Sequence, residues 1–195
     1  LPNLASFRPK KLRKTAFCGL LDVEVRIFVC KNLIFMQHRS SVFELTCAPI
    51  PTVRIALVGA GQRGRATLSR YAYVEGAEFR AVVDPDPTAV ASALELLREQ
   101  RRPLPETSTN AEAWRELCRR EDIDLIYICT DWSNHATMAV EAMRCGKHVA
   151  VEVPAATTVA DCWELVRTAE ATQRHCFMTE NCCYDWFALA TLDMH

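Results

Sequence analysis

Short apolar segments alternate with amphipathic segments along most of the chain. Five apolar stretches have the length and boundaries of buried strands, at residues 53–58, 79–84, 125–129, 148–153 and 176–179. Between them, apolar residues recur with helical spacing, over about residues 65–74, 88–101, 111–120, 136–146 and 159–173. This alternation predicts an α/β fold, in which a doubly wound parallel sheet carries helices on both faces.

Polar residues and a glycine mark several helix ends. Thr88 follows a proline and is expected to cap the helix that runs to about residue 101. Thr158 and Asp161 have the spacing of a capping box, which predicts a helix start at residue 159. Gly146 is expected to end the helix before it, because glycine is favoured just beyond a helix.

The pattern divides the chain into three parts. Residues 1–48 show no sustained period and are treated as an unassigned N-terminal extension. Pro49 and Pro51 mark the start of the α/β domain, which is expected over residues 49–184. Residues 185–195 are interpreted as the start of a truncated second domain. The first residue is Leu1 rather than Met, so we expect the chain to be part of a longer protein.

The basic stretch Lys10–Lys14 has the charge of a signal-peptide start. Asp22, Glu24 and Arg26 interrupt the apolar segment that follows, so the core of a signal peptide is missing. As read, the chain is expected in the cytoplasm, or outside it if a signal has been lost.

Composition and charge narrow the class of protein. Half of the residues are hydrophobic, 24% are charged and the net charge is −1, which is ordinary for a soluble globular protein. A charge so close to zero favours neither a nucleic-acid nor a membrane-surface partner. No apolar run reaches the ~18 residues that a transmembrane helix needs. The ten cysteines contain no Cys-x-x-Cys spacing, so we expect free thiols and no metal site.

A glycine-rich turn lies between the first strand and the first helix. It reads Gly59-Ala60-Gly61-Gln62-Arg63-Gly64, the Gly-x-Gly-x-x-Gly pattern of dinucleotide-binding Rossmann folds. Gly59 permits the tight turn, Gly61 admits a pyrophosphate, and Gly64 allows close packing of the helix. Asp84 ends the second strand at about the 20-residue distance at which an acid binds the ribose hydroxyls, which favours NAD over NADP. Arg63 is close enough to soften that preference.

Three polar segments follow the later strands and should meet at the carboxyl edge of the sheet, where ligands bind in such folds. They are residues 130–135, 152–154 and 180–184. Ordinary structural roles are open for several of their residues, including helix capping by Asp131 or Ser133. Glu152 differs, because an acid in an apolar strand needs a partner.

Several of these motifs together resemble a known family. The stretch from Gly146 to Val149, followed by Glu152-x-Pro154 after a glycine-rich start, resembles the Gfo/Idh/MocA group of oxidoreductases. That group usually carries Glu-Lys-Pro, and here Val153 replaces the lysine. The stretches over residues 152–166 and 174–185 are similar to glycoside hydrolase family 109, whose members are NAD-dependent α-N-acetylgalactosaminidases.

The resemblance implies that the chain is the NAD-binding domain of an NAD-dependent glycoside hydrolase that acts on N-acetylgalactosaminides by transient oxidation and elimination. Its other partner would be a small-molecule sugar, and homo-oligomer formation stays open. Together the glycine motif and the resemblance give the expected NAD contacts: Gly59, Gly61, Gln62, Arg63, Gly64, Asp84, Trp132, Ser133, Asn134, His135, Glu152, Val153 and Asn181.

No catalytic residue is assigned. Tyr184 is conceivable as an acid or base, although a packed aromatic with a hydrogen-bonded hydroxyl is the favoured role. Two alternatives remain: a sugar dehydrogenase of the Gfo/Idh/MocA group, and a non-catalytic nucleotide-binding fragment. The chain by itself is expected to be inactive.

Overall fold

The computed structural model describes residues 41–71 and 73–193. Within them, six parallel strands form one sheet in the order β3-β2-β1-β4-β5-β6, which is the Rossmann order. The strands and helices are β1 (Val53–Val58), α2 (Gln62–Tyr71), β2 (Ala77–Val83), α3 (Pro87–Glu99), β3 (Glu106–Ser108), α4 (Ala113–Leu117), β4 (Leu125–Ile128), α5 (Trp132–Arg144), β5 (His148–Val151), α6 (Val159–Thr172), β6 (Cys176–Met178) and α7 (Trp186–Asp193).

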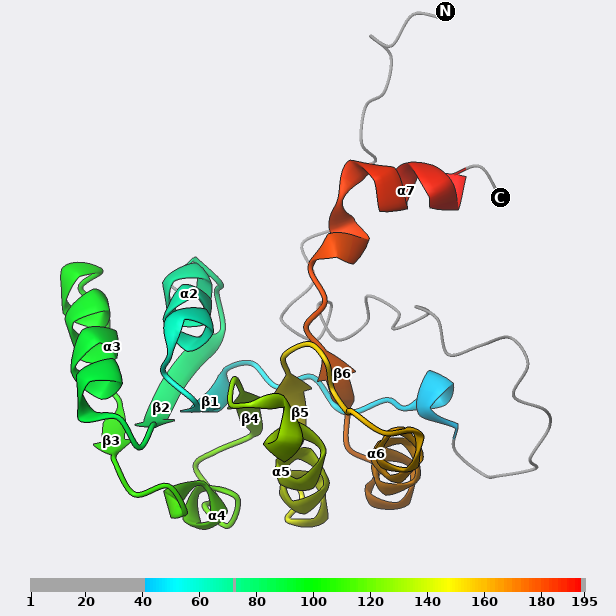
Figure 1. Cartoon of the computed structure of the whole chain (residues 1–195), viewed down its shortest axis with the longest axis horizontal. Helices are drawn as coiled ribbons and strands as arrows, with labels where there is room; N and C mark the ends of the chain where they lie inside the picture. Colours follow the sequence, from blue (N-terminus) through cyan, green and yellow to red (C-terminus); the bar gives the residue numbers. More distant parts are fainter. Residues whose placement is uncertain (1–40, 72, 194–195) are drawn as a thin grey trace, which may run out of the picture.

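Helices cover both faces of the sheet (Figure 1). Alternate residues of β1 point to opposite faces, with Ile55 and Leu57 packed on the side of α2 and α3, and Ala56 and Val58 on the side of α4, α5 and α6. Every residue of β4 and β5 is buried, as expected for strands covered on both sides. The doubly wound fold predicted from the hydrophobic pattern is therefore confirmed.

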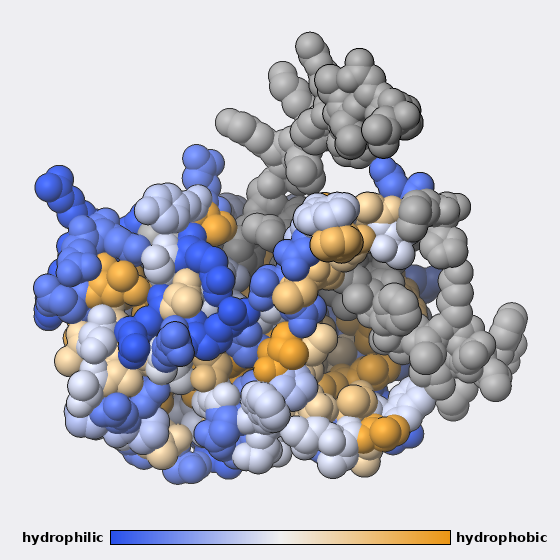
Figure 2. All heavy atoms as spheres, turned by 45° about the horizontal axis from the view of Figure 1, so that its top comes forward, coloured by the Kyte–Doolittle hydropathy of each residue, from blue (hydrophilic) through white to orange (hydrophobic). Residues whose placement is uncertain are grey.

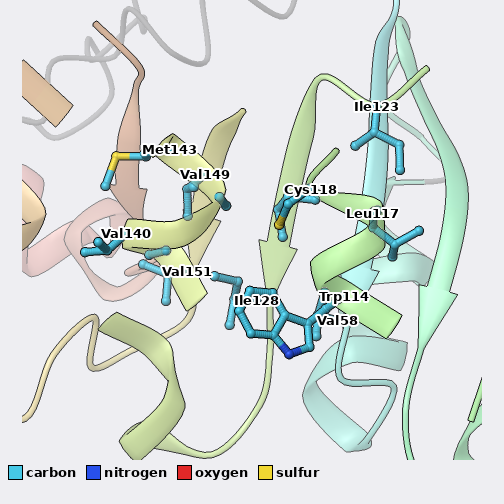
Figure 3. Close-up of a cluster of buried hydrophobic side chains, with 14 of the residues drawn as sticks. Val58, Trp114, Leu117, Cys118, Ile123, Ile128, Val140, Met143, Val149 and Val151 are labelled. Carbon is cyan, nitrogen blue, oxygen red and sulfur yellow. The ribbon is translucent and has the colours of Figure 1, made fainter. Parts of the chain in front are cut away.

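The larger core cluster lies between the sheet and α4, α5 and α6 (Figure 3). Trp114 and Leu117 of α4 pack there with Ile128 of β4 and Met143 of α5, all of them buried. Burial of so many apolar side chains supplies the main driving force for folding. On the opposite side, hydrophilic residues predominate over the outer surfaces of α2 and α3 (Figure 2).

Several element boundaries differ from those expected. Asp86, not Thr88, is the N-cap of α3, because its carboxylate accepts a hydrogen bond from the Thr88 N–H at 2.8 Å. The N-cap role of Thr158 is confirmed, since its hydroxyl accepts from the Asp161 N–H. The edge strand β3 was not expected, because its polar residues carry no apolar period.

Part of the predicted N-terminal extension packs on this domain. The side chain of Ser41 caps a short 3-10 helix, η2 (Val42–Glu44), and Val42 and Leu45 contact the larger core cluster. The Val42 N–H also donates to Glu170 of α6 at 3.3 Å. Residues 1–40, including the basic stretch Lys10–Lys14, lie outside the described residues.

Candidate functional site

The glycine-rich turn joins β1 to α2 at the carboxyl edge of the sheet. Gly59 has a φ of 95°, and an added Cβ there would collide with the carbonyl oxygen of Cys129. A Cβ on Gly64 would collide with the Gly59 carbonyl oxygen. A Cβ on Gly61 would instead meet no atom within 4 Å.

The space above Gly61 is therefore open, whereas Gly59 and Gly64 pack closely against the backbone of Cys129 and Gly59, respectively. The first turn of α2, beginning at exposed Gln62, directs backbone N–H groups and the positive end of the helix dipole toward the same edge. An uncovered backbone next to a helix N-terminus is the arrangement that binds a pyrophosphate. The residues present thus fit a dinucleotide.

Asp84 follows β2 directly and binds the glycine-rich turn. One carboxylate oxygen accepts from the Ala60 N–H at 2.7 Å, and the other accepts from the Asp86 N–H at 2.8 Å. The acid predicted to bind the ribose therefore also fixes the position of the turn relative to β2. Each oxygen keeps a second lone pair for a ligand hydroxyl.

The segment after β4 forms the start of α5. Trp132 is exposed, and the side chains of Ser133 and Asn134 both donate to Asp131, at 3.2 and 2.6 Å. His135 is buried, with its ring nitrogens 2.8 Å from the Pro154 carbonyl oxygen and 2.9 Å from that of Thr130. His135 therefore joins the loops that follow β4 and β5.

Glu152 follows β5 and is buried, as its position in an apolar segment suggested. Its Oε2 pairs with the Nε of Arg63 at 2.8 Å, and its Oε1 accepts from the hydroxyl of Tyr127 at 3.1 Å. The partner expected for this acid is thus Arg63. Val153, in the position of the lysine of Glu-Lys-Pro, is 37% exposed at the edge.

Asn181 follows β6 and accepts a hydrogen bond from Nη2 of Arg63 at 3.2 Å through its Oδ1. The structure therefore brings Arg63, Glu152 and Asn181 together, from three separate segments. Asp84 lies beside Ala60, at the end of β2. Tyr184, in the 3-10 helix η3 (Cys182–Tyr184), is largely exposed.

Two groups beneath this edge, the buried Tyr127 and the partly buried Cys129, were not identified from the sequence. Burial raises the pKa of the Tyr127 hydroxyl, so it stays protonated and can donate to Glu152. Burial and, to a smaller extent, the nearby Glu152 carboxylate raise the pKa of the Cys129 thiol to about 12. The hydrogen bond to Glu152 raises the pKa of the Arg63 guanidinium, which keeps the arginine side chain charged. The only feature of the sequence that could have pointed to them is Tyr127, a tyrosine inside an apolar central strand.

Seven cysteines of the described residues are free thiols: Cys118, Cys129, Cys145, Cys162, Cys176, Cys182 and Cys183. Cys18 and Cys30 lie outside that part of the chain. Among the described residues, no group of His, Cys, Asp or Glu side chains is arranged to hold a metal ion. No helix of the described ranges has both the length and the apolar character needed to cross a bilayer.

Comparison with curated proteins gives close relatives. Over 158 residues, 81% of this chain, it is 53% identical to glycosyl hydrolase family 109 protein 2 of Phocaeicola vulgatus, and covers 38% of that protein. It is 50% identical over 156 residues, 80% of the chain, to an alpha-N-acetylgalactosaminidase of Bacteroides fragilis, and covers 37% of it. The chain thus spans less than two fifths of the length of these relatives, and the resemblance seen in the sequence is confirmed for this portion.

Among solved structures, a myo-inositol dehydrogenase from Lactobacillus casei, in complex with NAD(H) and myo-inositol, is similar with a TM-score of 0.61. The match is 25% identical and covers 73% of this chain and 42% of that one. Residues 53–180 match the model of the oxidoreductase family with an NAD-binding Rossmann fold. Because this match covers most of the chain, the protein belongs to the Gfo/Idh/MocA oxidoreductase family, whose cofactor-binding domain it contains.

Proposed function

We propose that the chain is the NAD-binding part of an NAD-dependent glycoside hydrolase that acts on N-acetylgalactosaminides by transient oxidation and elimination. The observation that carries this proposal is the identity of half or more to family 109 proteins, one of them named an alpha-N-acetylgalactosaminidase. The substrate and the reaction are proposed for a full-length enzyme, since these relatives are much longer than this chain.

Bound NAD supplies reversible removal of hydride from a sugar carbon, which makes the neighbouring C–H acidic enough for elimination. The residues of this chain bind the cofactor and orient it. The turn from Gly59 to Gly64 receives the pyrophosphate, and Asp84 receives the ribose hydroxyls. We place the remaining contacts along the loops after β4, β5 and β6, at Trp132, Ser133, Asn134, His135, Glu152, Val153 and Asn181.

A sugar dehydrogenase of the same family is the second candidate, favoured by the similarity to the myo-inositol dehydrogenase. Val153 weighs against it. The side chain of valine has no group that moves a proton, whereas the usual Glu-Lys-Pro motif supplies an amine at this position. A protein that binds the nucleotide without catalysing a reaction is the third candidate.

The test uses the full-length protein with a chromogenic α-N-acetylgalactosaminide and with free sugars. If the protein is a hydrolase, we expect release of the chromophore without net formation of NADH, and loss of activity when NAD is removed from the protein. Accumulation of NADH with a free sugar would establish the dehydrogenase instead. NAD binding without either reaction would establish the third candidate.

A further inference from the structure

Arg63 connects three segments that are far apart in the sequence. It stands in the first turn of α2, within the glycine-rich motif. Its Nε donates to Glu152, after β5, and its Nη2 donates to Asn181, after β6. The planar guanidinium offers donors in fixed directions, so one side chain serves both acceptors at once.

The Glu152 carboxylate depends on this contact. Its side chain is 8% exposed, and a carboxylate so far removed from water needs a charged partner. Tyr127 supplies one neutral hydrogen bond, and Arg63 supplies the positive charge. The Arg63 side chain is 42% exposed, so it covers the acid from the solvent side.

The direction of the Arg63 side chain argues against a role in recognising the ribose of the cofactor. The ribose hydroxyls of a dinucleotide bind beside the acid at the end of β2, here Asp84. In the sheet, β5 is separated from β2 by β1 and β4 (Figure 1). Three interstrand steps amount to roughly 14 Å. The guanidinium that pairs with Glu152 is therefore directed toward the β5 side of the turn, and its hydrogen-bonding partners there, Glu152 and Asn181, do not include Asp84.

We propose that Arg63 is a positioning residue, which fastens the start of α2 to Glu152 and Asn181 and does not recognise the ribose 2′ position. Selection of NAD over NADP then depends on the residues on the β2 side of the turn. The proposal differs from the sequence-based expectation that Arg63 softens the preference set by Asp84, and the second test below decides between the two. The inference rests on the NAD binding in the proposed function.

The first test needs no cofactor. Thermal unfolding is compared for the whole chain, Arg63→Ala, Glu152→Gln and the double variant. We expect Arg63→Ala to lower the midpoint, and the double variant to lose clearly less than the sum of the single losses, because the two residues form one contact. Arg70→Ala, which removes an exposed cation from the last turn of the same helix, is the matched control and should add independently. Strict additivity for Arg63 and Glu152 would overturn the proposal.

The second test measures the dissociation constants of NAD and NADP by calorimetry. We expect Arg63→Ala to weaken both by a similar factor, about 3- to 10-fold, leaving their ratio within about 2-fold of wild type. Arg63→Lys should behave like Arg63→Ala, because an ammonium does not span both acceptors. Absence of NADP binding by the wild type supports the proposal as well. A selective loss of NADP binding in Arg63→Ala that Arg63→Lys restores would overturn it. Failure of the wild type to bind NAD would instead contradict the proposed function, and the unfolding test would then decide the role of Arg63 alone.

Discussion

Single residues at this site serve the fold and the expected ligand at the same time. The Asp84 carboxylate accepts two backbone hydrogen bonds, one of them from Ala60 in the glycine-rich turn. Glu152 is held by Arg63 and Tyr127. The distance from the glycines located Asp84, and the position of an acid within an apolar strand drew attention to Glu152. The partners Ala60, Arg63 and Tyr127 were not predictable, because these contacts join residues distant in the sequence.

Replacing Asp84 tests its proposed contact with the ribose. Asp84→Ala removes the acceptor of the Ala60 N–H together with the expected acceptor of the ribose hydroxyls, so NAD affinity should fall roughly tenfold or more. Calorimetric titration with NAD measures this. Asp86→Ala is the matched control, because it removes the next acid and the cap of α3 and should cost about 1 kcal/mol of stability without changing affinity. Unchanged affinity in Asp84→Ala would remove that residue from the site.

At the scale of elements, hydrophobic periodicity predicted the order of strands and helices well. It succeeded for β1, β4 and β5, because strands buried on both faces have continuous apolar runs. It missed β3, whose residues Glu106–Ser108 pair with β2 at the edge through backbone hydrogen bonds alone. It also placed the start of α2 too late, at residue 65, because Gln62 and Arg63 are polar and lie on the exposed side of the first turn.

The junction of β1 and α2 gives two glycines with opposite expected effects. Gly64→Ala places a Cβ against the Gly59 carbonyl, so the apo protein should lose about 1–3 kcal/mol of stability. Gly61→Ala meets open space, so the apo protein should unfold as the wild type does while its NAD affinity falls, since the methyl group takes the space of the pyrophosphate. Urea unfolding and NAD titration of both variants make the measurement. Full NAD affinity in Gly61→Ala would show that the ligand does not approach the turn there.

At the scale of the whole molecule, the sequence was sufficient for the fold class and the family, since both follow from the order of elements and the local motifs at their ends. The assembly of the carboxyl edge was not predictable in detail. Arg63 meets Asn181 from a distance of 118 positions, and such a pairing exists only after the sheet has brought β1, β5 and β6 into one layer. The opposite edge of the sheet carries a similar long-range contact.

At that opposite edge, His148 and His175 stack with ring centroids 5.3 Å apart, at the starts of β5 and β6. The His175 N–H donates to Nδ1 of His148 at 3.1 Å, so this nitrogen must be unprotonated. Burial, together with the neighbouring His175 and Arg174, lowers the pKa of His148 to about 4, against the opposing effect of Asp124. Folding of the whole domain therefore favours the neutral form of His148.

The sign of the pH effect follows from linkage. A histidine whose pKa is lower in the folded state binds its proton more readily when unfolded, so its contribution to stability is complete above the unfolded pKa of about 6.5 and is lost as the pH falls toward 4. The loss should reach up to about 3 kcal/mol. The pKa values of Asp122 and Asp124 are lowered by Arg120 and Arg54, respectively. Their contributions to stability are therefore lost mainly below pH 3.8, outside the pH range in which His148 acts. Urea unfolding between pH 7 and pH 4 should show a falling stability in the wild type and a nearly flat one in His148→Asn, whose amide oxygen can still accept from His175. Equal slopes in the two proteins would show that another group is responsible.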